Sequence, residues 1–312
     1  MALTEPTTSS RRGIDFEALK ARRGADIPGQ IFYGVILAGV AVAFFMVGAV
    51  VWDVIDKSWV IVSDRFWNFL TSASSSDPAK AGVVQGIRGS LLIAGIVFLS
   101  FPIGISAAIY LEEYAEDNWA SRLIQVTVRN LAGVPSIVYG LLGLAVFVQS
   151  LRGITGGSSV LAGGITIAVL VLPIVVITSA EAVRAVPASL REGAYGLGAT
   201  KWEVIRTQIV PAAMPGILTG TVLAIGRALG EAAPLLVIGA VGWYTTGNND
   251  FLDQLQGAFT ALPMNITYFA RDVAEIWSPH AAASSLVLLL LVFFVNLVAI
   301  VARARISKKL GR

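Results

Sequence analysis

The sequence predicts an all-α integral membrane protein with six transmembrane helices. Of its 312 residues, 55% are hydrophobic and only 14% are charged, and the mean hydropathy of +0.75 is far above that of a water-facing globular surface. Apolar windows recur along the chain, each about 20 residues long, which is the length that one helix needs to cross a hydrocarbon core of about 30 Å. They begin near Ile31, Leu91, Leu131, Leu161, Gly216 and Ala281.

The composition excludes several classes of chemistry. The chain has no cysteine, so disulfides, thiolate catalysis and cysteine-ligated metal sites are excluded. A single histidine, His280, leaves metal chemistry few ligands. The net charge of +3 would be compatible with nucleic acid, but Lys and Arg are concentrated in short segments between the apolar windows. Orientation in a bilayer explains that placement better, so we expect lipid and no nucleic acid as a partner.

The basic residues also predict the topology. Residues 1–29 are polar and have no apolar segment close to the start, so we expect a cytoplasmic tail and not a cleavable signal peptide. Residues 30–305 form the transmembrane domain, and 306–312 form a second cytoplasmic tail. With the N-terminus inside, residues 111–130 and 183–208 are cytoplasmic as well. Together with Arg303 and Arg305 at the end of the last span, the four cytoplasmic segments then hold 16 Lys and Arg against six on the outer side, which supports this orientation in the cytoplasmic membrane.

The fifth apolar segment is too long for one straight crossing. Ile209–Ala240 has 32 residues, and we expect a helix that enters from the cytoplasm and bends, because the segment contains Pro211, Pro215 and Pro234. Two long outer loops are expected at about 53–85 and 241–280. In the second, the apolar spacing predicts a short helix lying at the interface and closed by a turn at Pro263.

The cytoplasmic segment 183–208 has the pattern of two short helices. Pro187 can open the first, whose apolar face is Leu190, Ala194 and Leu197 and whose end is marked by Gly196 and Gly198. Thr200 followed by Glu203 is a capping box, so a second helix begins at once. Such an element is too small for a core of its own. It either is an ordinary surface loop, or lies on the membrane or inserts into a partner.

The spacing of Glu192, Ala194, Gly198 and Pro211 resembles the EAA loop of ABC importer permeases. The chain departs from that pattern at Gly193, Gln208 and Val210. The resemblance implies the type I permease fold, with a cytoplasmic coupling helix that docks into an ATPase subunit through Glu192, Gly193, Ala194 and Gly198. The chain contains no GxxxxGK[ST] sequence, so it is not the ATPase and we expect no enzymatic activity.

Three further stretches resemble the phosphate-specific ABC importers, and in particular their A-type membrane subunits. They are "IYLEEYAED" (109–117), "NLAGVPSIVYGLLGL" (130–144) and "GRALGEAAPLL" (226–236), and "ALPMNITYF" (261–269) is similar to the A-type outer loop. The resemblance implies a C-type sister permease subunit, an ATPase dimer and an extracytoplasmic phosphate-binding protein as partners. ATP and Mg would be used by the ATPase, and this chain would bind no cofactor.

Other functions stay open from the residues alone. The EAA-like spacing would equally suit a permease for sulfate, molybdate or phosphonate. An arginine alone does not distinguish one of these oxyanions from another either. A secondary transporter or channel is the alternative from a different class. Coupled transporters commonly have inverted repeats, and no second interrupted span matches "GRALGE" in the other half of this chain.

Two polar groups in "NLAGVPSIVYG" are candidates for the substrate pathway. Gly133 and Pro135 fall at the expected start of the third span, and Ser136 and Tyr139 could offer hydroxyls to a passing anion. Helix packing is the alternative role for the small residues, Gly133 and Gly140. Nearby, Glu112, Glu113, Glu116 and Asp117 form an acidic cluster that we expect to be a solvated face, with contact to a partner subunit as the alternative.

The strongest site prediction concerns Arg227 and Glu231. Arg227 is the twelfth residue counted from Gly216, near the bilayer midplane, where a charge costs about 2.5 to 3.5 kcal/mol on insertion scales. Glu231 follows one turn later and can pair with it. A structural ion pair is the alternative reading, but charges inside a membrane more often mark a substrate pathway. If the family resemblance holds, Arg227 lowers the barrier to the phosphate anion and Glu231 compensates the arginine when no anion is present.

Overall fold

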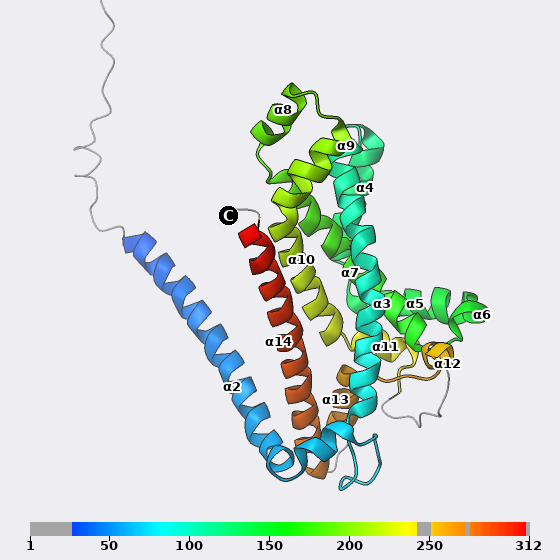
Figure 1. The fold of residues 1–312 in the computed structure, drawn as a ribbon. Coiled ribbons are helices and arrows are strands. Elements are labelled where there is room, and N and C mark those ends of the chain that lie inside the picture. The colour runs from blue at the N-terminus through cyan, green and yellow to red at the C-terminus, as the bar shows by residue number, and fades with distance from the viewer. Residues whose placement is uncertain (1–26, 242–250, 272–274, 310–312) are drawn as a thin grey trace, which may run out of the picture. The chain divides into compact units, whose positions relative to one another are not determined.

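The computed structural model describes residues 27–241, 251–271 and 275–309, and within these ranges all regular structure is helical (Figure 1). The chain divides into two units after Asp53. The first unit contributes the N-terminal part of helix α2 (Ile27–Thr71), which belongs to a candidate membrane span with a mean hydropathy of 2.6 in its most apolar window. The first predicted span is thus confirmed as an apolar helix.

The second unit contains the remaining helices. Its first half consists of α3 (Val84–Ile109), the π-helical turn η1 (Tyr110–Tyr114), α4 (Trp119–Ala132), α5 (Ser136–Gly143), the π-helical η2 (Leu144–Ser150), α6 (Arg152–Thr155) and α7 (Val160–Arg184). Its second half consists of α8 (Ala188–Gly196), α9 (Lys201–Val204), the π-helical turn η3 (Ile205–Ile209), α10 (Val210–Gly230), α11 (Ala233–Ile238), α12 (Phe251–Gln256), α13 (Leu262–Arg271), the 3₁₀ turn η4 (Glu275–Trp277) and α14 (Ser278–Lys309).

Five helices in the described ranges are long and apolar enough to cross a membrane, and a sixth crossing is possible if a bent pair counts as one span. The bent pair is the third predicted span, and its prediction needs correcting. The chain does not begin a helix near Leu131. Instead α4 ends at Ala132 and the chain turns by 103° into α5 and η2. Much of segment 111–130, predicted as a cytoplasmic loop, is therefore the helix α4.

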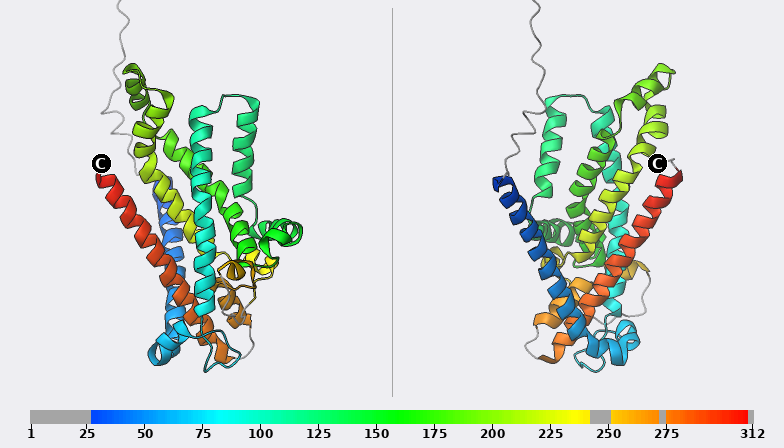
Figure 2. Two further views of the ribbon diagram at one scale, coloured as in Figure 1. Left: turned by 45° about the vertical axis from the view of Figure 1, so that its right-hand side comes forward. Right: turned by 90° about the vertical axis from the view of Figure 1, so that its left-hand side faces the viewer.

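The core of the second unit is built around α7. Helix α7 packs along α3 on one side and along α10 on the other, and α14 packs along α10 (Figure 2). Side chains such as Phe101, Ile167 and Leu235 are buried in the apolar cluster that these helices share with α5 and α11. Close approach requires glycine at one point, since a Cβ on Gly164 would lie 2.5 Å from Cδ1 of Ile96. Helix α7 is thus the central element against which α3 and α10 pack.

The ends of the helices group as the predicted topology requires. The turn η1, helices α8 and α9 and the C-terminal end of α14 lie at one end of the second unit, while α13 and residues 54–71 lie at the other (Figures 1 and 2). Segments 183–208 and the C-terminal part of α14, both predicted to be cytoplasmic, are therefore on the same side.

The opposite end is closed by a polar cluster around His280. The Arg65 guanidinium donates hydrogen bonds to the carbonyls of Ala79 and Ala81, the latter at 2.8 Å, and lies 3.0 Å from Nε2 of His280. The second outer loop contains two short helices, α12 and α13, and the prediction that a turn at Pro263 closes a helix is wrong. Pro263 lies in the first turn of α13, where a backbone N–H would have no intrahelical acceptor, so the N–H that proline lacks is not missed.

Candidate functional site

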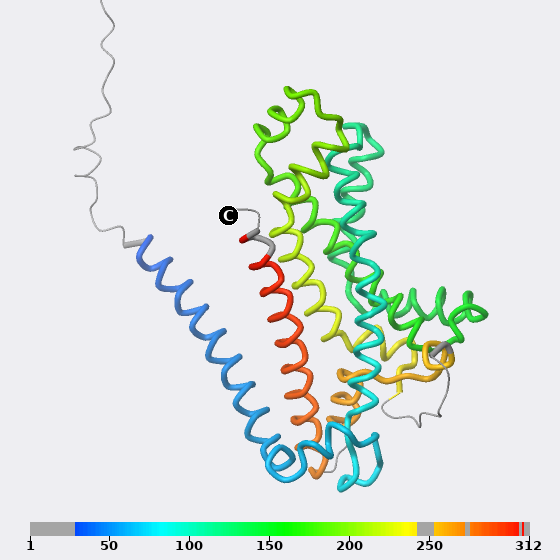
Figure 3. Tube along the Cα trace, viewed as in Figure 1, coloured from blue at the N-terminus to red at the C-terminus, as the bar shows by residue number. Residues whose placement is uncertain are grey.

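The fifth span ends inside the bundle. Residues 201–230 form one continuous helical stretch, and Pro211 and Pro215 do not interrupt it. The break comes at Glu231, whose φ of −79° and ψ of 115° are extended, and α11 then begins with Pro234 in its first turn. Proline at position 234 removes the hydrogen bond that would have continued α10 to the carbonyl of Gly230. Figures 1 and 3 show that α10 stops part-way along α14.

The third span is broken at a comparable place. Gly133 caps α4, and Pro135, with a ψ of 136°, precedes the first residue of α5. The hydroxyl of Tyr139 donates a hydrogen bond of 2.9 Å to the carbonyl of Leu131 and so ties the two sides of this break together. Tyr139 is only 5% exposed. Its hydroxyl hydrogen is thus already used within the chain, although we had predicted it as a donor for a passing anion.

The two breaks lie against each other. Helix α5 packs on α11, and a Cβ on Gly140 would lie only 2.8 Å from Cα of Pro234. The packing role predicted for Gly140 is thus confirmed. Gly133 has no such neighbour, since its Cβ would meet nothing nearer than the carbonyl of Asn130 at 3.5 Å. Irregular backbone at membrane depth is tolerated where protein buries it or where it lines a water-filled cavity, so two packed breaks mark a functional region.

Arg227 and Glu231 meet at the end of α10. The Nε of Arg227 lies 3.2 Å from Oε1 of Glu231, and their side chains are 40% and 18% exposed. The predicted pair is therefore present, but its geometry differs from the prediction. Glu231 lies beyond the helix and reaches back to it. Only Nε of the guanidinium is used, and neither Nη group of Arg227 has a hydrogen-bond partner among the described residues.

A cavity of about 810 Å³ opens beside Arg227 between α7, α10 and α14. Its polar lining consists of Thr178, Glu181, Thr219, Arg227 and Asn296. The Oδ1 of Asn296 is buried and has no hydrogen-bond partner among the described residues. Asn296 was visible in the sequence as an isolated amide in an apolar span, but its position beside Arg227 was not.

The fourth predicted pathway residue, Ser136, opens α5. It is partly buried, and its hydroxyl makes no hydrogen bond to the residues that the structure describes. No group of three or more His, Asp and Glu side chains that could hold a metal ion is found in the described ranges. The site therefore offers hydrogen-bond donors and a guanidinium, which suit an anion.

Comparison with known proteins places this architecture in one family. Residues 100–312 match the family described as binding-protein-dependent transport system inner membrane component. The chain is 34% identical over 287 residues to the probable ABC transporter permease protein YqgH of Bacillus subtilis, covering 89% of this chain and 90% of that protein. The chain belongs to this family of transport permeases.

Relatives of this permease include proteins of named function. The phosphate transport system permease protein PstA 1 of Mycobacterium tuberculosis is 35% identical over 283 residues, covering 85% of this chain and 88% of that protein. The corresponding PstC of Haemophilus influenzae is 33% identical, covering 62% and 69%. Among solved structures, a chain of a bacterial alginate ABC transporter superposes with a TM-score of 0.65 at 15% identity, covering 89% and 96%. That likeness shows the importer permease fold.

In this permease the segment 183–208 folds largely as predicted. Helix α8 follows Pro187, and the capping box between Thr200 and Glu203 is present. Gly198 has a φ of 81°, a conformation that favours glycine, so it fixes the corner between α8 and α9. The second short helix is not separate, however. Helix α9 continues through η3 into α10, which joins this corner rigidly to the fifth span.

The residues predicted to couple to an ATPase occupy different faces of α8 and its end. Glu192 and Gly193 are exposed, and a Cβ on Gly193 would meet nothing within 4 Å. Ala194 instead packs with Leu190 against the apolar cluster beneath the helix. Beyond α8, Leu197 is 91% exposed, and Trp202 is 60% exposed. The end of the protein around α8 thus presents both charge and exposed apolar surface.

Proposed function

We propose that this permease is a membrane subunit of an ATP-driven importer for inorganic phosphate and forms the translocation pathway together with a sister subunit. Two independent findings support it. Relatives named as phosphate transport permeases match most of the chain at about one-third identity. In addition, the site at the two breaks has the chemistry that an oxyanion needs. A sulfate, molybdate or phosphonate permease is the alternative, and no relative described above favours it.

The observation that carries the proposal is that Arg227, which lines the open cavity, pairs with Glu231 through Nε alone. Neither Nη group is engaged by the residues that the structure describes. A guanidinium presents its N–H groups in a planar fork that matches two oxygens of phosphate. Arg227 can therefore take up an anion without first breaking its pair with Glu231. Glu231 keeps the arginine compensated between transport events and weakens anion binding enough for release.

The remaining predicted pathway groups have secondary roles in this proposal. Ser136 offers a hydroxyl at the start of α5, and Tyr139 holds the third-span break in shape through Leu131. Asn296 adds an amide to the wall of the cavity beside Arg227. Uncharged polar groups can line the path without binding the anion so tightly that it stays there.

The partners follow from the same proposal. We place both termini and α8 in the cytoplasm, in accordance with the excess of basic residues there. There α8 would dock into an ATPase dimer through Glu192, Gly193, Ala194 and Gly198. The ATPase uses ATP and Mg, while this chain binds no cofactor. An extracytoplasmic phosphate-binding protein delivers the substrate at the other end, and the sister subunit is of the C type.

The test is uptake of labelled phosphate by cells that lack their own A-type permease and carry this chain. We expect the wild type to restore uptake that excess sulfate does not block. Arg227→Gln removes the charge and the guanidinium fork but keeps a polar side chain whose amide can still donate hydrogen bonds. Two unit charges about 4 Å apart interact with about 4 kcal/mol at an effective dielectric constant of 20, and exposure of Arg227 reduces this. We therefore expect uptake to fall about tenfold or more.

The matched control is Arg152→Gln. Arg152 is exposed in α6 and does not line the cavity, so uptake should be unchanged. Assembly of the complex is checked in every case by co-purification of the ATPase. Normal uptake with Arg227→Gln in an assembled complex would contradict the role of Arg227. Uptake that sulfate blocks would contradict the assignment of phosphate.

A further inference from the structure

The acidic cluster after α3 is not the solvated face that the sequence predicts. Glu116 and Asp117 are exposed, as expected. By contrast, the side chains of Glu112 and Glu113 are only 13% and 8% exposed. Both belong to η1, which we call the acidic turn (Tyr110–Tyr114). Each forms an ion pair with an arginine of the same chain.

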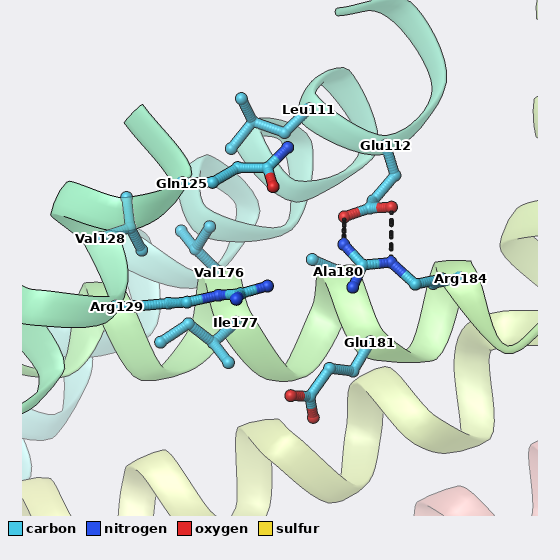
Figure 4. A pocket seen from close by; sticks show the side chains of 10 residues that line it. All are labelled: Leu111, Glu112, Gln125, Val128, Arg129, Val176, Ile177, Ala180, Glu181 and Arg184. Carbon is cyan, nitrogen blue, oxygen red and sulfur yellow. Dashed lines mark hydrogen bonds and ion pairs between the residues drawn. The ribbon is translucent and has the colours of Figure 1, made fainter. Parts of the chain in front are cut away.

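Glu112 joins the acidic turn to the end of α7. Its two carboxylate oxygens accept hydrogen bonds from Arg184, at 2.6 Å from Nη2 and 3.1 Å from Nε (Figure 4). Arg184 is the last residue of α7 and its side chain is 54% exposed. An ion pair that is open to water on one side contributes little, so this contact alone holds the acidic turn only weakly.

Glu113 joins the acidic turn to α8. Its Oε1 accepts hydrogen bonds from Nη2 of Arg191 at 2.9 Å and from Nε at 3.2 Å. The same guanidinium donates from Nη1 to the carbonyl of Val186 at 2.7 Å and from Nη2 to the carbonyl of Val183 at 3.0 Å. Arg191 therefore holds together three segments, and its charge is compensated by a carboxylate that is almost fully buried.

Two more contacts involve the same short segment. The Nζ of Lys201, the first residue of α9, lies 4.9 Å from the centre of the Tyr114 ring, within the range of a cation–π interaction. Below the acidic turn, Ile105 and Ile109 of α3 pack against the apolar cluster that also holds Leu190 of α8. Residues 112, 113 and 114 thus contact, in order, the end of α7, helix α8 and the start of α9.

From this arrangement we infer that Glu113 is the positioning residue that connects the coupling helix α8 to α3, through its ion pair with Arg191. The chain joins α8 directly to α7 and α9, and its only covalent connection to α3 runs through α7. Apart from the path through α7, a displacement of α8 reaches α3 only through non-covalent contacts. The apolar contacts are not directional, whereas the ion pair, in which two N–H groups of Arg191 converge on one nearly buried oxygen of Glu113, restricts both distance and orientation. The inference rests on the proposed function, because it gives α8 the coupling role.

The test uses the complete importer, with its sister subunit, ATPase and binding protein, reconstituted in lipid vesicles. Phosphate transported and ATP hydrolysed are measured together, and so is the stimulation of hydrolysis by the loaded binding protein. Glu113→Gln removes the charge and keeps the shape. We expect basal hydrolysis to persist while phosphate transported per ATP falls about tenfold, as expected for the loss of a typical coupling free energy between two sites.

A double variant separates this effect from simple destabilisation. Glu113→Gln leaves Arg191 without its carboxylate, and an unpaired buried charge is itself destabilising. Glu113→Gln combined with Arg191→Gln removes both charges, so that penalty disappears while the connection to α3 stays absent. We expect the double variant to be as uncoupled as Glu113→Gln. Recovery of normal coupling in the double variant would overturn the inference.

The matched control lies four residues further along the chain. Asp117 pairs with Arg122 at 2.9 Å, but the side chains are 82% and 70% exposed. Asp117→Asn should leave phosphate transported per ATP unchanged. Normal coupling in both Glu113→Gln and Asp117→Asn would refute the role of Glu113 and leave the proposed function standing. Conversely, if the wild type carried another oxyanion, the assignment of phosphate would fail, and the effect of Glu113→Gln on stimulated hydrolysis would still decide the inference.

Discussion

Replacement of Gly140 by valine should separate the two helix breaks. A Cβ at position 140 would lie 2.8 Å from Cα of Pro234 and 3.0 Å from Cβ of Val237. Carbon atoms in good contact are about 3.5 to 4.0 Å apart, so even the first added atom overlaps with α11. The nearest atom is backbone of a proline, which cannot rotate away. Helices α5 and α11 must therefore move apart to admit the two γ-methyl groups as well.

The expected magnitude follows from the cost of overpacking. Extra methylenes in a packed core cost about 1 to 3 kcal/mol, and valine has no large advantage over glycine in helix propensity to offset this. We expect a loss of about 2 to 3 kcal/mol, which is a large part of the stability of a typical domain. Moving α5 also moves Ser136 and Tyr139, which belong to this helix, so phosphate uptake should fall together with stability.

The assay compares thermal unfolding of the purified complex and phosphate uptake for Gly140→Val and Gly95→Val. Gly95 lies in the interior of α3, and a Cβ there would meet nothing within 4 Å. The control should therefore match the wild type in both measurements. Equal unfolding temperatures and equal uptake for the two variants would refute the close contact between α5 and α11 on which this reasoning depends.

Two further predictions concern Gly198, at the corner between α8 and α9, and Tyr139, at the break in the third span. Gly198→Ala places a side chain at a φ of 81°, which costs about 1 to 2 kcal/mol, so ATPase coupling should weaken several-fold. Gly198→Asn should retain more activity, since asparagine tolerates this conformation, and equal activity of the two variants would contradict the explanation. Tyr139→Phe removes the hydrogen bond to Leu131 and should lower stability by about 0.5 to 1.5 kcal/mol with the KM for phosphate unchanged. A raised KM for phosphate at unchanged stability would instead indicate that the Tyr139 hydroxyl contacts the substrate.

Local sequence signals predicted the parts of the fold that depend on neighbouring residues. The capping box of Thr200 and Glu203, the helix after Pro187 and the pairing of Arg227 with Glu231 all involve groups within a few positions of each other. Their geometry is set by the local backbone and by the reach of a side chain. The apolar windows likewise predicted most of the spans, because length and hydropathy suffice for that purpose.

The positions of the breaks could not be predicted in the same way. Three prolines lie between residues 209 and 240, and the sequence does not show which of them interrupts the helix. Pro211 lies two positions after the end of the π-helical turn η3, a local widening that can accommodate a proline in an apolar helix. Pro234 has no such turn before it, and the backbone bends there. The choice is made by packing against α5, which is distant in sequence.

The burial of Glu113 was missed for a related reason. Four acidic residues within six positions are typical of a solvated surface, and two of the four behave so. What distinguishes Glu113 is Arg191, which lies 78 positions away and is brought to it only by the folding of α7 and α8 against α3. A pairing over such a separation leaves no trace in local spacing.

Arg191 and Arg227 both pair with a carboxylate, and the comparison shows how a structural charge differs from the charge proposed for transport. Arg191 uses Nε, Nη1 and Nη2, and its partner Glu113 is nearly buried, so its hydrogen-bonding capacity is spent within the chain. Arg227 uses Nε alone, at 3.2 Å, and the residue lines an open cavity. A guanidinium at membrane depth is costly unless its donors are satisfied. In the proposed pathway, the passing anion is the partner that satisfies the remaining donors of Arg227.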